Sequence, residues 1–121
     1  MDRKIIDDWI QFHAERRESS DPLFSAWDQV SDLVYRDPEA AWLLVLELVA
    51  AAPNDFVLAN VSAGPLENLI CRSPGFDISD RIELQAKRDP KFCRCLTGVW
   101  GIPSALEERL EKYLSQIKDP L

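Results

Sequence analysis

Hydrophobic residues recur at helical spacing through most of the chain. Near the start, apolar side chains share one face of a predicted helix and polar side chains share the other. The apolar face holds Ile5, Ile6, Trp9, Ile10 and Phe12, and the polar face holds Lys4, Asp8, Gln11, Glu15 and Glu18. A second stripe, of Leu23, Trp27, Val30 and Val34, predicts a second helix. No segment shows sustained period-two alternation between hairpin turns, so the pattern favours an all-α fold.

The dipeptide Asp-Pro marks three predicted helix starts, at residues 21–22, 37–38 and 89–90. Aspartate accepts hydrogen bonds from free N–H groups of a first turn, and proline loses no hydrogen bond there. The helix predicted from Pro38 to about Ala52 is apolar on nearly all sides, so we expect it at the centre of the fold. The dipeptides lie 16 and 52 residues apart, so they show no constant repeat period.

The second half of the chain predicts further short helices. A short apolar segment at 56–61 precedes a helix that starts at Ala63-Gly64-Pro65, and Ser73-Pro74-Gly75 is a predicted turn. A weaker helix follows at 78–87, another runs from Pro90 to Trp100 and ends near Gly101, and the last carries a stripe from Leu106 to Ile117. We therefore expect one domain over residues 1–121, with seven or eight short helices in an irregular antiparallel stack, either HEAT-like or an orthogonal bundle.

Composition and charge narrow the class of protein. The chain is 46% hydrophobic and 29% charged, as in ordinary globular domains, and its net charge is −7. Residues 1–60 contain five Lys or Arg and twelve Asp or Glu, whereas residues 61–121 contain nine of each. Such a charge disfavours nucleic-acid and anionic-membrane partners and favours a basic protein surface. A general contribution to solubility is the alternative interpretation.

The N-terminal residues, the longest apolar run and the cysteines together predict the cellular location of the protein. Asp2, Asp7 and Asp8 occupy the region where a secretory leader would be basic and then apolar. The longest apolar run, 40–52, is shorter than the roughly 20 residues that span a bilayer. The chain has three cysteines without an extracellular spacing pattern, which suits free thiols in a reducing compartment. We expect a cytoplasmic protein.

Candidate catalytic and metal-binding groups are sparse. The single histidine, His13, adjoins the apolar stripe of the first helix and has no motif around it. Cys93-Arg94-Cys95 lacks further ligands at zinc spacing, so we predict Cys95 in the core and Cys93 nearer the helix flank. All four tryptophans, Trp9, Trp27, Trp42 and Trp100, lie on apolar stripes and are predicted core residues. We expect no cofactor and no metal.

The carboxylates are the candidate binding residues. Glu67 lies near the third position of the helix predicted to start at Gly64, where it either stabilises free N–H groups or serves as an anion in a pocket. Asp28 and Asp32 are four residues apart and share a helix face, which suits either a solvated surface or a binding surface. The predicted partner-binding set is Asp8, Glu15, Glu18, Asp28, Asp32 and Glu67.

Three sequence elements resemble a known family. They are Ala41-Trp42, the run Ala63 to Ile70 (AGPLENLI), and Arg88-Asp89-Pro90 followed by Phe92, Leu96, Val99 and Trp100. Over residues 27–101 the chain is similar to a family of small bacterial domains of unknown function, with Gly-Pro-Leu-Glu as its most specific element. The resemblance implies a fold and supplies no catalytic residue.

The sequence therefore predicts a protein-binding module rather than an enzyme. The leading hypothesis is an acidic, immunity- or antitoxin-like inhibitor that occludes a basic, toxin-like enzyme. The alternative is a structural or accessory subunit that packs into a homodimer or a larger assembly. An enzyme ranks third, because it would need a pocket that joins His13 or a cysteine to a carboxylate.

Overall fold

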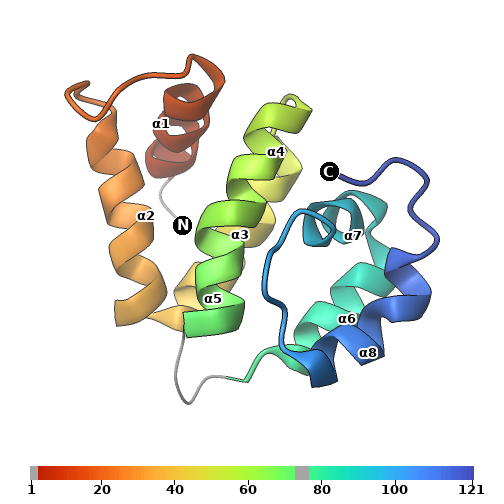
Figure 1. Cartoon of the computed structure of the whole chain (residues 1–121). Helices are drawn as coiled ribbons and strands as arrows, with labels where there is room; N and C mark the ends of the chain where they lie inside the picture. Colours follow the sequence, from red (N-terminus) through yellow and green to blue (C-terminus); the bar gives the residue numbers. More distant parts are fainter. Residues whose placement is uncertain (1–2, 73–76) are drawn as a thin grey trace.

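The computed structural model describes residues 3–72 and 77–121. These residues form helices and their connecting segments and contain no strand. The elements are α1 (Arg3–Ala14), α2 (Phe24–Arg36), α3 (Pro38–Ala51), α4 (Asp55–Val61), the π-helical turn η1 (Ser62–Leu66), α5 (Glu67–Arg72), α6 (Ser79–Arg88), α7 (Pro90–Leu96) and α8 (Ser104–Leu114) (Figure 1). The prediction of an all-α fold is confirmed. The predicted turn at Ser73-Pro74-Gly75 lies outside the described residues.

Helix α3 lies at the centre of the fold. Figure 1 shows α1 and α2 on one side of the α3, α4 and α5 group and α6, α7 and α8 on the other. Helix α3 packs against α1 and α2, and on its other side against α7. Its buried side chains are Ala41, Trp42, Leu44, Val45, Leu48 and Val49. The predicted central position is thus confirmed, although Leu43 on the same helix is 57% exposed.

Two of the three Asp-Pro pairs cap helices as predicted. The Asp37 carboxylate accepts a hydrogen bond from the Ala40 N–H at 3.2 Å, and Asp89 accepts from the Lys91 and Phe92 N–H groups at 3.0 and 3.3 Å. Asp21 instead accepts from the Leu23 N–H at 2.8 Å in a turn that precedes α2. At all three sites the aspartate side chain accepts a hydrogen bond from a nearby backbone N–H, but only Asp37 and Asp89 directly precede the first residue of a helix.

Replacing Asp89 with alanine should lower the free energy of unfolding by about 1 kcal/mol, because two first-turn N–H groups lose their acceptor. Asp89→Asn keeps a side-chain oxygen and should cost less. Urea unfolding of both variants measures the difference. Equal losses for both would show that the cap hydrogen bonds do not stabilise α7.

Helix α1 ends earlier than the sequence pattern suggested. The Arg17 N–H donates to Phe12 O and the Arg16 N–H to His13 O, both at 3.0 Å, and Arg16 has a φ of 51°. This is the Schellman arrangement, with arginine in the left-handed position that glycine usually takes. Glu15 and Glu18 therefore lie beyond α1, so their predicted place on its polar face is wrong. The Arg16 guanidinium lies 4.0 Å from the centroid of the Phe56 ring.

The predicted helix start at Ala63-Gly64-Pro65 is also wrong, because α4 continues through η1 into α5. Proline inside an α-helix lacks a donor and clashes with the carbonyl four residues earlier, and a wider turn relieves that clash. The Glu67 N–H reaches the carbonyls of Gly64 and Ser62 across this turn. Gly64 precedes the proline, and its missing Cβ removes the clash that disfavours helical backbone there.

Helix α7 ends at Leu96 rather than at Trp100. The chain leaves the helix through Thr97 and Gly98, and Gly101 has a φ of 75°, a conformation that glycine adopts readily. As a result Trp100 lies in a loop and is 82% exposed, and its predicted place in the core is wrong. Trp9 and Trp42 are buried as predicted.

Candidate functional site

A crevice of about 300 Å³ opens between α1, α2 and the continuous α4–η1–α5 segment. We call it the Trp27–Glu67 crevice. Its lining residues are Trp9, His13, Trp27, Val30, Ser31, Asn60, Ala63, Gly64, Pro65, Glu67 and Asn68. The π-helical turn thus forms one wall, and π-helical turns occur frequently at functional sites. The crevice is the candidate functional site of the domain.

Aromatic rings from α1 and α2 build the opposite wall. Trp9 and His13 are one turn apart on α1, and their ring centroids lie 4.2 Å apart with a tilt of 51°. Trp27 stacks on Phe24, with centroids 5.0 Å apart and planes within 15°. Trp27 is 38% exposed, so its predicted burial in the core is wrong. Its position at the crevice leaves an indole partly exposed to solvent.

His13 contributes a nitrogen without a partner. Its Nε2 atom is buried and has no hydrogen-bond partner among the described residues. Burial also lowers the pKa of His13 from 6.5 to about 4, because the cation would lose its solvation. His13 is therefore neutral at pH 7, and a neutral imidazole nitrogen is able to accept a hydrogen bond.

Glu67 brings the crevice and the loop after α7 together. Its Oε1 accepts a hydrogen bond from the Trp100 backbone N–H at 3.2 Å, across 33 residues of sequence. The residue is half-buried. Because α5 continues from η1, the carboxylate does not stabilise a free helix start, and that interpretation of Glu67 is wrong. The alternative, an anion at a pocket, agrees with its place in the lining.

The crevice is negatively charged. Of the described residues that line it, Glu67 is the single acidic one, and none is Lys or Arg. The neutral polar groups are Ser31, Asn60 and Asn68, and the Asn60 amide Nδ2 already donates to Phe56 O at 2.8 Å. The Asn60 side-chain oxygen is an acceptor, and its amide nitrogen keeps one further N–H donor. The Glu67 carboxylate and the amide oxygens thus offer acceptors to an occupant that donates hydrogen bonds.

Comparison with known proteins identifies the family. A family model described as a family of unknown function, DUF6869, matches residues 13–117. The chain belongs to this family. The match confirms the resemblance and is wider than residues 27–101, since it includes the end of α1 and all of α8. No curated protein and no solved structure matches the chain.

The acidic residues predicted as a binding set are dispersed in this DUF6869 domain. Of the six, Glu67 alone lines the crevice. Asp8, Glu15 and Asp32 form ion pairs with Lys4, Arg17 and Arg36, respectively. The hydrogen bond from Arg17 lowers the pKa of Glu15. Glu18 and Asp28 are exposed, and neither has an ion-pair partner among the described residues.

A second group of exposed carboxylates lies on α8. Glu107, Glu108 and Glu111 are exposed, have no ion-pair partner in the described part of the chain, and line an open depression of about 610 Å³. The sequence pattern places these residues on the solvated face of the last helix, and their exposure confirms that interpretation. The depression is more open than the Trp27–Glu67 crevice and has no aromatic lining.

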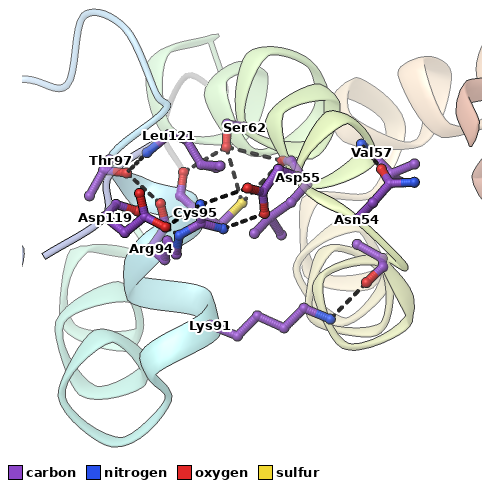
Figure 2. Close-up of polar contacts among 12 residues, drawn as sticks. Asn54, Asp55, Val57, Ser62, Lys91, Arg94, Cys95, Thr97, Asp119 and Leu121 are labelled. Carbon is purple, nitrogen blue, oxygen red and sulfur yellow. Dashed lines mark hydrogen bonds and ion pairs between the residues drawn. The ribbon is translucent and has the colours of Figure 1, made fainter. Parts of the chain in front are cut away.

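A buried polar cluster joins α4 and η1 to α7. The Ser62 Oγ lies 2.6 Å from Cys95 O, 3.2 Å from Leu58 O and 3.2 Å from Cys95 Sγ (Figure 2). Burial raises the pKa of Cys95 to about 11, so the thiol stays protonated and unreactive. Cys95 is in the core as predicted, and Cys93 is buried too, not at the helix flank. We interpret this cluster as structural.

Arg94 ties the chain after α8 to α4. Its guanidinium binds the Asp55 carboxylate through two nitrogens, at 2.6 and 3.0 Å, and its Nε donates to Asp119 O at 2.6 Å (Figure 2). The Thr97 hydroxyl accepts from the Leu121 N–H at 2.9 Å. Lys91 caps the end of α3 by donating to Ala50 O and Ala52 O. The side chains of Arg94 and Lys91 therefore bind groups of the same chain, and the two residues do not form a free cationic site.

Within residues 3–72 and 77–121, no group of three or more His, Cys, Asp or Glu side chains is placed to hold a metal ion. No helix in the described residues is long and apolar enough to cross a bilayer. Cys71 is exposed, and its thiol donates to Gly101 O at 3.3 Å.

The stability of the domain should fall as the pH drops from 6.5 to 4, the interval between the ordinary and the folded pKa of His13. The unfolded chain binds a proton on His13 in this interval while the folded chain does not, so lower pH favours unfolding. Because the side chain is only partly buried, we expect about 1 kcal/mol. Urea unfolding at several pH values measures the effect.

The matched control is His13→Gln, which removes the titrating group. The difference between the two proteins should vary over this pH interval and level off above it. A difference that does not change with pH would contradict the neutral, desolvated state of His13.

Proposed function

We propose that this domain is a non-catalytic protein-binding module that recognises a basic region of its partner through the Trp27–Glu67 crevice. The observation that carries the proposal is the combination of a partly exposed indole and a carboxylate in one crevice whose described lining holds no cation. Tryptophan is enriched among the residues that dominate binding energy at protein interfaces. A carboxylate beside it selects for positive charge on the partner.

The chemistry of the side chains supports binding rather than catalysis. Burial raises the pKa of both Cys93 and Cys95, which disfavours their thiolates. No hydrogen bond joins His13 to a thiol or a carboxylate in the described residues, and nucleophilic catalysis needs such an oriented pair. The crevice therefore offers groups that bind an occupant but none that is activated to react with it.

In its more specific form, the proposal makes the domain a cytoplasmic, immunity- or antitoxin-like inhibitor of a basic enzyme. The net charge of −7 would accelerate the encounter with such a partner. Glu18 and Asp28 contribute, because they are exposed and lack an ion pair among the described residues. Inhibition would come from occlusion of the enzyme surface.

The proposal is tested by quantitative partner capture from the native cell extract at low and moderate salt. The bait is the wild type, the crevice variant Trp27→Ala/Glu67→Gln, or the control variant Trp100→Ala/Glu111→Gln. Both variants lose one tryptophan and one negative charge, so they differ only in where these groups lie. The retained partner is then purified and its affinity for each bait is measured by calorimetry.

We expect a basic partner whose affinity falls at least about tenfold for the crevice variant and little for the control. Equal affinity for all three baits would refute the crevice as the recognition site. Capture of no partner by any of them would refute the protein-binding function itself.

A homo-oligomeric accessory subunit is the second candidate, and a specific observation favours it. Tyr35, Leu43 and Leu84 are each more than half exposed, at 55%, 57% and 53%. In a dimer, the burial of exposed apolar side chains of this size would contribute to association. A dimer at low micromolar concentration that persists at high salt, and that Leu43→Glu dissociates, would favour assembly over charge-driven recognition.

A further inference from the structure

We infer that the Trp27–Glu67 crevice accepts the guanidinium group of one arginine side chain from the partner, an inference that rests on the proposed function. The crevice has about 300 Å³, the lower end of the usual range for small-molecule pockets. A single long side chain suits this volume better than a cofactor does.

The charge of the lining requires a cation. Glu67 is half-buried at the crevice, and no described lining residue neutralises it. Its Oε1 takes one hydrogen bond from the neutral Trp100 N–H, so the charge itself has no counter-ion there. An occupant with a positive charge would supply a charge-assisted hydrogen bond to this carboxylate.

The aromatic wall favours a flat cation. Trp27 is 38% exposed and is held in place by its stacking on Phe24. A guanidinium stacks on the face of an indole, where cation–π attraction and planar contact combine, whereas an ammonium is compact and more strongly hydrated. Trp27 therefore offers a planar group a partly exposed indole that Phe24 holds in place.

The hydrogen-bonding groups match a donor with several N–H groups. Guanidinium has five N–H donors and no acceptor. The lining offers the Glu67 carboxylate oxygens and the Asn60 side-chain oxygen. Because these acceptors come from α5 and α4, one forked donor is able to reach both, which a single ammonium does less well.

The test is an NMR titration that follows the four tryptophan indole N–H signals of the full chain. The probes are N-acetyl-L-arginine amide, the lysine analogue, and the neutral citrulline analogue, which has nearly the shape of arginine without its charge. We expect arginine amide to shift the Trp27 signal in a saturable way and to leave in place the signal of Trp42, which is buried and does not line the crevice. Affinity should be in the millimolar range, because a single side chain buries little surface.

Two matched pairs of variants assign the site. Glu67→Gln keeps an oxygen for the Trp100 N–H but removes the charge, and should weaken arginine amide binding at least about fivefold. Glu111→Gln removes an equal charge from α8 and should leave the affinity unchanged. Trp27→Ala, followed through the Trp9 signal because this variant lacks the Trp27 signal, should also weaken binding, whereas Trp100→Ala should not.

Each outcome decides the inference. Equal shifts with the citrulline analogue would refute recognition of the cation, and equal or tighter binding of the lysine analogue would refute the preference for guanidinium. Shifts that survive Glu67→Gln and Trp27→Ala would place the site elsewhere. If a captured partner depends on the crevice variant while arginine amide does not bind, the proposed function stands and the arginine inference fails.

Discussion

Replacing Phe92 with alanine should lower the free energy of unfolding by about 3 to 5 kcal/mol, the usual cost of truncating a fully buried phenylalanine. The Phe92 side chain is 0% exposed and lies between α7 and α3. Its ring meets the Trp42 ring edge to face, with centroids 5.6 Å apart and planes at 86°. The truncation removes this pair and leaves a cavity in the contact that joins the two sides of the fold.

Urea unfolding followed by far-ultraviolet circular dichroism measures the loss. The matched control is Leu43→Ala on α3, where the side chain is 57% exposed and the expected loss is within about 0.5 kcal/mol. A loss below about 2 kcal/mol for Phe92→Ala would mean that α7 and α3 repack readily, contrary to the close packing of this core.

Helices whose limits and buried faces depend on neighbouring residues could be predicted from the sequence. Helix α3 begins and ends within one residue of its predicted limits, since Asp-Pro at its start and Pro53 after its end act on the adjacent backbone. The stripe of α8 gave Leu106 and Leu110 as buried residues, and both are buried. The number of predicted short helices also agrees with the elements in the described residues.

Pro65 shows why other boundaries failed. Proline is favoured in the first turn of a helix and usually ends or kinks a helix when it lies inside one, and the sequence does not reveal that a π-helical turn accommodates Pro65 within a continuous segment. This turn changes the chemistry of Glu67, because its carboxylate accepts from Trp100 instead of from a free first turn. The partner is 33 residues away, and only the tertiary fold brings the two together.

The spacing of charged residues along the sequence indicated local ion pairs, which the charge counts did not take into account. Lys4 and Asp8, and Asp32 and Arg36, are four residues apart and form ion pairs on α1 and α2. Spacing of four places opposite charges side by side on a helix, so part of the acidic set is neutralised locally. Charge counts by segment therefore overestimated the free negative charge of the N-terminal helices.

The same substitution at two glycines should have very different effects. A Cβ atom added at Gly98 would lie 2.9 Å from Ser62 Oγ, 3.0 Å from Ser62 Cβ and 3.3 Å from Leu121 Cβ. Ser62 is held by its hydrogen bond to Cys95 O at 2.6 Å and is 0% exposed, so it has little freedom to move away. Gly98→Ala should therefore cost about 2 kcal/mol, within the usual range for overpacking.

Gly64→Ala is the control, because a Cβ there meets no atom within 4 Å apart from its own chain neighbours. Higher helix propensity would stabilise the variant, whereas the clash with Pro65 would oppose this, so we expect a net change within about 1 kcal/mol. Urea unfolding of both variants compares the two sites. Equal losses would mean that backbone freedom, rather than the space around Ser62, explains glycine at position 98. A selective loss at Gly98 would establish that the turn after α7 packs too closely on Ser62 to admit a Cβ at position 98.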